Sequence, residues 1–140
     1  MTRPLLLLAV FALTAPACDT AGEIEPLFGP LYVSLAPGSA RAVLLESAFG
    51  IPCSPALAVE TRAQSARVTI SVLGTEPTSP PCTTQNPSTA TVPFSPGTSG
   101  PFAVEVLYGG QSDEYAYSVR SGVARLDSVR TSTTLPGPRP

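Results

Sequence analysis

Cys53 and Cys82 are two of the chain's three cysteines, and their surroundings predict a disulfide between them. They lie in the proline-rich stretches Ile51-Pro52-Cys53-Ser54-Pro55 and Pro80-Pro81-Cys82, which flank a strand hairpin expected over residues 57–72. In an oxidising compartment such a pair forms a structural disulfide by default, and closing a loop of about 30 residues contributes roughly 3–4 kcal/mol. A redox or metal-binding pair is disfavoured because no histidine or second thiol pair accompanies it.

The residue types that the chain lacks argue against most enzyme chemistry. It contains no histidine, and all 8 of its basic residues are arginine. Triads of the Ser-His-Asp kind, imidazole metal sites and lysine nucleophiles are therefore excluded. We predict a protein that is not an enzyme, with no catalytic residue, no metal site and no cofactor.

Carboxylates and tyrosines are the remaining candidates for chemistry. Paired acids can hydrolyse glycosides, and Asp113-Glu114 beside Gly109-Gly110 could hold Ca²⁺ weakly, although the spacing of a calcium loop is missing. We interpret the carboxylates as solvated residues of strand faces and turns. Three tyrosines could form a platform for a sugar or peptide, but we interpret them as part of the core. The residues are Glu46, Glu60, Glu105, Asp113, Glu114, Tyr108, Tyr115 and Tyr117.

Short strands are the elements that position these residues. With 17 prolines and 11 glycines among 140 residues, the chain is too rich in breakers for a helical bundle and too apolar for full disorder. Alternation of apolar and polar residues predicts strands at 31–36, 57–62, 67–72, 102–108, 115–120 and 123–129, with a short edge strand at about 89–94. Ser39–Gly50 fits either a helix or a strand, and its neighbours favour the strand. The pattern predicts an all-β, antiparallel sandwich of about 7–8 strands.

Four parts follow along the chain: a signal peptide over 1–17, a tether over 18–26, the sandwich over 27–130 and a disordered, proline-rich tail over 131–140. Arg3 precedes the apolar run Leu5–Leu13, which small residues follow up to Ala17. This order is typical of an export signal. A run of about nine apolar residues is too short to span a bilayer, which needs about 20.

Cys18 follows the residues Ala15-Pro16-Ala17, and together they resemble the lipobox of bacterial lipoproteins. The resemblance implies lipidation of Cys18 by diacylglycerol and an N-acyl chain after cleavage. Ala15 stands where leucine is commonest, and an ordinary A-x-A cleavage site ending at Ala17 is the alternative. Three cysteines cannot all pair within one chain, so lipidation of Cys18 leaves Cys53 and Cys82 as one pair.

Two other segments resemble bacterial immunoglobulin-like and fibronectin-like extracellular domains. They are the turn Leu35-Ala36-Pro37-Gly38-Ser39-Ala40 and the segment Asp113-Glu114-Tyr115-Ala116-Tyr117-Ser118-Val119. The resemblance implies an immunoglobulin-like sandwich in which Tyr117 is a corner tyrosine and Val119 takes a position often held by a disulfide cysteine. The chain lacks the tryptophan and the cysteine spacing of immunoglobulin domains.

Together these features predict a non-catalytic lipoprotein of the cell envelope, a structural or binding module anchored in the membrane through Cys18. A protein or glycan outside the cytoplasm is the expected partner. Nucleic acid is not, because the arginines form no cluster that could displace counterions. The alternatives are a secreted, soluble inhibitor of proteases and, less favoured, a carboxylate-based glycosidase.

Overall fold

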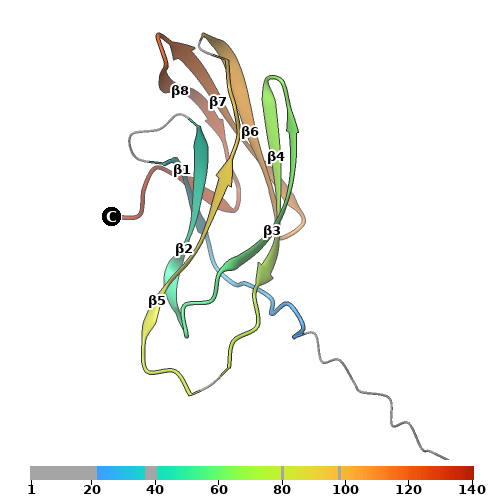
Figure 1. The fold of residues 1–140 in the computed structure, drawn as a ribbon, viewed down its shortest axis with the longest axis vertical. Coiled ribbons are helices and arrows are strands. Elements are labelled where there is room, and N and C mark those ends of the chain that lie inside the picture. The colour runs from blue at the N-terminus through green and yellow to red at the C-terminus, as the bar shows by residue number, and fades with distance from the viewer. Residues whose placement is uncertain (1–21, 37–40, 80, 98) are drawn as a thin grey trace, which may run out of the picture.

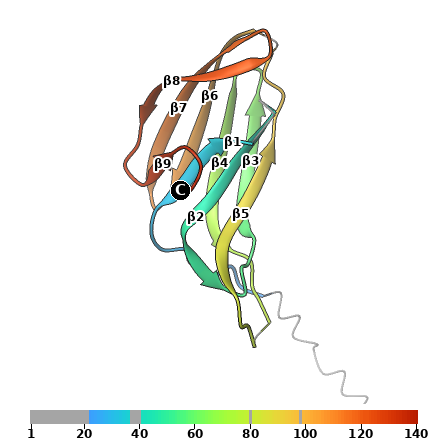
Figure 2. The same ribbon diagram turned by 90° about the vertical axis from the view of Figure 1, so that its left-hand side faces the viewer.

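The computed structural model describes residues 22–36, 41–79, 81–97 and 99–140, which form nine strands and no helix. The strands are β1 (Leu31–Leu35), β2 (Ala42–Pro52), β3 (Leu57–Gln64), β4 (Arg67–Thr75), β5 (Gln85–Pro93), β6 (Gly100–Tyr108), β7 (Gln111–Arg120), β8 (Val123–Arg130) and β9 (Thr134–Pro136). They build one sheet in the order β5-β2-β1-β9 and a second in the order β3-β4-β6-β7-β8. The two sheets pack face to face as a sandwich (Figures 1 and 2), which confirms the predicted all-β fold.

Alternating side chains of both sheets meet in one core. Along β7, for example, Asp113, Tyr115, Tyr117 and Val119 are buried while the residues between them are only partly covered. The buried apolar residues are Leu31, Val33, Val43, Leu45 and Val92 from the four-stranded sheet, and Leu57, Val68, Ile70, Val72, Phe102, Val104, Val106, Tyr115, Tyr117 and Val119 from the five-stranded sheet. The period-2 pattern therefore located the inward faces correctly.

The sheets are mixed, which corrects the expectation of a purely antiparallel sandwich. β4 and β6 run parallel, with Val68 opposite Val104, because the chain crosses to the other sheet through β5 between them. β1 and β9 are also parallel, with Leu31 opposite Thr134. Alternation along a strand defines its two faces but not the direction of the neighbouring strand, so the sequence pattern could not distinguish these pairings.

Two ambiguous segments are strands in the structure. β2 covers the described part of the stretch that fitted either a helix or a strand, with Val43 and Leu45 fully buried. β5 extends the short edge strand that was expected at about 89–94, and it is indeed an edge of its sheet. Its pairing with β2 shifts between Glu46 and Gly50, and Pro87 lies at this irregularity. Proline is tolerated there because an edge strand leaves one row of N–H groups unpaired.

The predicted disordered tail over residues 131–140 also needs correction. Residues 134–136 form β9 beside β1, and the amide N–H of Gly137 donates to the carbonyl oxygen of Val33 at 2.9 Å. Thr134 is only 2% exposed. The proline-rich composition of this segment predicts disorder, but the hydroxyl groups of residues 132–134 have a buried partner, which is described below.

The N-terminal part of the domain is attached to the lower end of the sandwich in Figure 1, where residues 22–30 are drawn in blue. Glu25 exchanges two backbone hydrogen bonds with Thr75, of 3.0 and 2.9 Å. Gly74 has a φ of +151°, and a Cβ there would collide with the carbonyl oxygen of Glu25. Glycine therefore permits this close approach, and residues 22–26 of the expected tether contact the domain.

Candidate functional site

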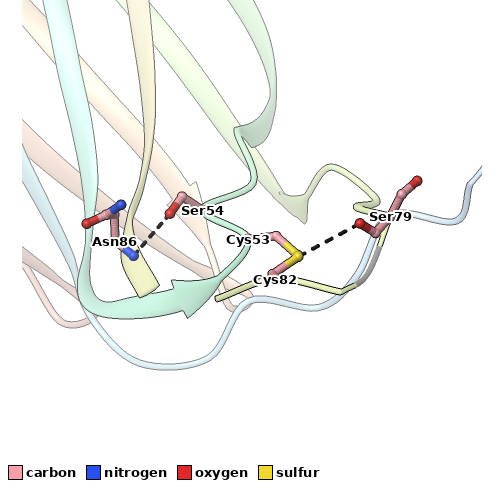
Figure 3. The surroundings of a disulfide bond; sticks show 5 residues. All are labelled: Cys53, Ser54, Ser79, Cys82 and Asn86. Carbon is pink, nitrogen blue, oxygen red and sulfur yellow. Dashed lines mark hydrogen bonds between the residues drawn. A yellow bond between two sulfur atoms is a disulfide. The ribbon is translucent and has the colours of Figure 1, made fainter. Parts of the chain in front are cut away.

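The disulfide between Cys53 and Cys82 is formed, as the sequence predicted (Figure 3). Cys53 directly follows β2, which ends at the lower end of the sandwich in Figure 1. The two Cα atoms are 4.9 Å apart across a sequence separation of 29 residues. Ser79 contributes a carbonyl oxygen 3.9 Å from the Cys82 sulfur, and this is a packing contact because a disulfide sulfur carries no proton to donate. Disulfides persist in oxidising compartments, so the bond indicates a location outside the cytoplasm.

The turn that carries Cys53 is held by the backbone just before and within the start of β5. Cys53 and Ser54 both have positive φ angles, 67° and 49°, which residues other than glycine rarely adopt. The N–H of Cys53 donates to the carbonyl oxygen of Thr84 at 3.1 Å, and the N–H of Asn86 donates to Ser54 Oγ at 3.0 Å. These two bonds and the disulfide hold the end of the proline-rich connection and the start of β5 against the turn that follows β2.

The segment before β1 crosses the same end of the molecule. The hydroxyl of Tyr108 is within hydrogen-bonding distance of two carbonyl oxygens, Leu27 at 3.0 Å and Gly29 at 2.8 Å. Burial raises the pKa of this phenol, so the hydroxyl remains a donor at neutral pH. Tyr108 thus holds the segment at residues 27–29, and the pairing of Glu25 with Thr75 holds it closer to its N-terminal end.

The lipidation candidate Cys18, the signal peptide over 1–17 and the turn residues Pro37–Ala40 lie outside the described residues. Their roles remain predictions from the sequence. Gly22, the first described residue, lies directly against the ring of Pro77. Cys18 is therefore four residues from the connection that the disulfide closes.

Glu105 and Glu114 are the two carboxylates that the structure brings together. They are directly opposite each other on β6 and β7, on the outer face of the five-stranded sheet. The guanidinium group of Arg67 lies between them, 3.5 Å from Glu105 Oε2 and 3.0 Å from Glu114 Oε2. Arg130 also donates to Glu114, at 2.9 Å. Hydrogen bonds from Arg130 and Arg67 lower the pKa of Glu114 despite partial desolvation, whereas a general acid of a glycosidase needs a raised pKa.

We expect Arg67→Ala to destabilise the fold by about 0.5–1 kcal/mol, because it leaves two like charges facing each other across the strands. The pKa of Glu114 should rise in the same variant, and both effects should shrink in high salt. Urea unfolding and carboxyl NMR titration measure the two effects. Arg62→Ala is the matched control, since Arg62 is an exposed arginine of the neighbouring strand β3. Equal losses in both variants would contradict the bridging role of Arg67.

Asp113 is the candidate residue whose environment was predicted wrongly from the sequence. It was interpreted as a solvated turn residue, but it lies inside β7 and is 0% exposed. Its carboxylate accepts six hydrogen bonds of 2.6–3.1 Å, from the backbone N–H and the hydroxyl of each of Ser132, Thr133 and Thr134. Burial alone would raise the pKa of Asp113, but these bonds outweigh it and hold the pKa well below the usual range. The carboxylate therefore fixes the C-terminal segment in place.

The signal for this contact in the sequence is weak. An aspartate is followed 19–21 residues later by the run Ser132-Thr133-Thr134, and nothing in that spacing distinguishes a buried acceptor from a surface charge. Calcium binding at Asp113 is disfavoured by the same geometry, because both carboxylate oxygens are occupied by donors. No group of three or more potential metal ligands occurs among the described residues.

The tyrosines belong mainly to the core, as predicted. Tyr115 is fully buried, its hydroxyl is hydrogen-bonded to Thr134 Oγ1, and burial raises its pKa to about 12. Tyr117 stacks on Phe102, with ring centroids 4.8 Å apart, and burial raises its pKa to about 12 as well. The corner hydrogen bond implied for Tyr117 is not found among the described residues. Tyr115 is the tyrosine whose hydroxyl fastens a distant segment.

The outer face of the five-stranded sheet is shallowly hollowed. One hollow of about 490 Å³ lies over the cross-strand pair Ala103 and Ala116, between the longer side chains of Arg67 and Asp127. The hollow exists because the two alanines are short. Its charged side chains already have partners, since Arg67 binds Glu114 and Asp127 accepts from Ser118 Oγ at 3.0 Å. The hollow is therefore a weaker candidate for a ligand-binding site than the lower end of the molecule.

The described part of the chain contains no helix that is long and apolar enough to span a membrane. Comparison of the chain with protein-family models, with curated proteins and with solved structures finds no match. The fold and the geometry above are therefore the observations on which the function is argued.

Proposed function

We propose that this protein is a non-catalytic, lipid-anchored β-sandwich module of the cell envelope, exported and acylated at Cys18. The supporting observation is the disulfide, which uses Cys53 and Cys82 and indicates an oxidising compartment. It leaves Cys18 as the remaining thiol, directly after the residues that resemble a lipobox. Several acyl chains on one cysteine are enough for stable anchoring, which a single chain is not.

A binding or structural role fits this anchor better than catalysis. The two facing carboxylates are neutralised by arginines, and the buried Asp113 is fully occupied by hydrogen-bond donors. A protein or glycan outside the cytoplasm would meet the exposed strand edges or the connection from β4 to β5. We also propose that the sandwich is immunoglobulin-like, because two short segments of the sequence resemble such domains.

The anchor is tested by Cys18→Ser, for which we expect loss of the protein from the membrane fraction. Intact mass of the native protein should show a gain of several acyl groups and the loss of two hydrogens for the disulfide. Thr20→Ser is the matched control, because it changes a neighbouring hydroxyl residue without touching the cysteine. An unmodified Cys18 in a soluble native protein would refute the proposal.

An inhibitor of proteases is the second candidate, and one observation favours it. Residues 76–79 and 81 are exposed in a connection that Cys82 fastens to the domain, and a fastened, exposed loop is a common way to present a segment to a protease. Titration of the mature protein against a panel of proteases decides this point, and the absence of any inhibition would dismiss the candidate.

A further inference from the structure

Two phenylalanines are exposed where the segment before β1 crosses the lower end of the sandwich. Phe28 is 80% exposed and Phe49 is 63% exposed. The ring of Phe49 lies directly over Gly29, where a Cβ would be only 2.9 Å from the ring. Phe49 therefore lies beside the residue that follows Phe28, so both phenylalanines are exposed at the same end of the sandwich. Large aromatic side chains gain most when they leave water, so this exposure calls for a partner.

A second apolar pair lies farther along the same segment. Ile24 is 43% exposed and Leu73 is 46% exposed. Ile24 Cγ2 is 2.8 Å from the position that a Cβ would take at Gly74, so Ile24 lies against the end of β4, the strand that also carries the exposed Leu73. All four residues thus lie either in the segment 24–28 or in the strand ends that this segment contacts. We name the four residues Ile24, Phe28, Phe49 and Leu73 the apolar rim.

The length of chain between Cys18 and the apolar rim limits how far the rim can be from the anchor. Only four residue steps separate Cys18 from Gly22, which is in contact with Pro77. A fully extended chain covers at most about 3.6 Å per residue, so these steps span no more than about 14 Å. An acylated Cys18 lies at the bilayer surface, and the end of the sandwich that carries the rim must be close to it.

We infer that the apolar rim inserts into the interfacial layer of the membrane and orients the sandwich upright on it. The inference rests on the proposed acylation of Cys18. The two ends of the domain are well separated, because the turns at either end of β7 are joined by ten residues, or about 33 Å. Tyr108 fastens residues 27–29 beside one of these turns. The opposite turn, which leads into Val123, would then point away from the bilayer.

The charges beside the rim indicate which lipid it meets. Glu23, Glu25 and Glu76 are exposed around it, so anionic headgroups would be repelled. The contact is therefore apolar, and neutral phosphatidylcholine is the suitable probe. Attraction of a basic patch to anionic lipid is not the basis of this contact.

The chain contains no tryptophan, so single tryptophans can report depth without background. Acylated Phe28→Trp protein is reconstituted in phosphatidylcholine vesicles with and without brominated acyl chains, and Val123→Trp serves as the matched control. Val123 is 70% exposed at the opposite end, so neither substitution disturbs the core. We expect the emission of Phe28→Trp to shift to shorter wavelength and to lose most of its intensity with brominated lipid, and that of Val123→Trp to do neither.

Each other outcome has a distinct meaning. If vesicle-bound, acylated Phe28→Trp behaves as Val123→Trp does, the rim does not insert and the inference is wrong, while the anchor stands. If intact mass shows no acyl chain on Cys18, the proposed function and this inference both fall. Quenching of both tryptophans to the same extent would show that the domain lies flat, which also overturns the upright orientation.

Discussion

Replacing Asp113 by alanine is expected to lower the free energy of unfolding by at least about 3 kcal/mol. The carboxylate accepts from three backbone N–H groups and three hydroxyls of residues 132–134. Each buried donor that loses its acceptor costs about 1–3 kcal/mol, and the hydrogen bond between Tyr115 and Thr134 still joins β7 to β9. Urea unfolding measures the loss, and hydrogen exchange of the amides of Thr134 and Gly137 should become much faster in the variant.

Asp127→Ala is the matched control, since Asp127 is an exposed aspartate with one hydrogen bond, from Ser118. We expect it to change stability by no more than about 0.5 kcal/mol. An equally small effect of Asp113→Ala would show that the C-terminal segment does not depend on this carboxylate.

The contribution of Asp113 should also depend on pH in a defined direction. Its pKa in the folded protein is held well below the unfolded value of about 3.9. The stabilisation is therefore complete above that value and is lost as the pH falls below about 4 towards the folded-state pKa. The difference in stability between the native protein and Asp113→Ala should shrink over this range of pH.

Replacing both Cys53 and Cys82 by alanine is the second change with a large expected effect. For a loop of 29 residues, the chain-entropy model gives a loss of about 3.6 kcal/mol, which arises mainly in the unfolded state. The denaturant m-value should rise at the same time, because the unfolded chain can expand further. Urea unfolding of both proteins under oxidising conditions yields both quantities.

Ser79→Ala provides the comparison within the same loop, because Ser79 is exposed and touches the disulfide only through its backbone. No change is expected for it. Adding reductant to the native protein should reproduce the stability of the double alanine variant. A loss well below about 1 kcal/mol would contradict the view that the disulfide stabilises this small domain through its unfolded state.

Much of the fold could be predicted because the chain repeats one simple signal. Residues such as Val104 and Val106, which alternate with Ala103 and Glu105, define a strand with one buried face, and the same is true of β4 and β7. The disulfide could be predicted because cysteines in an exported chain have few alternatives. These features depend on local pattern or on composition, which a single sequence contains.

The features that could not be predicted depend on contacts between distant residues. The parallel pairing of β4 with β6 follows from the passage of the chain through β5 in the other sheet, which local alternation does not encode. Asp113 looked like a surface charge because aspartate is seldom buried without a partner, and its partners are 19–21 residues away. The apolar rim could not be predicted because folding brings Phe49 of β2 to the segment that carries Phe28, which is distant in the sequence.

The pairing of β9 with β1 has a consequence for the order in which the molecule is made. Thr134 is synthesised about a hundred residues after Leu31, its partner in the sheet, and it also donates to Asp113. Contacts between such distant residues form late and slow the folding of a β-sheet protein. A nascent chain that ends before residue 132 lacks both contacts, so one edge of β1 and the carboxylate of Asp113 have to wait for these partners until the C-terminal segment has been synthesised. We therefore expect the pairing of β1 with β9 to be among the last steps of folding.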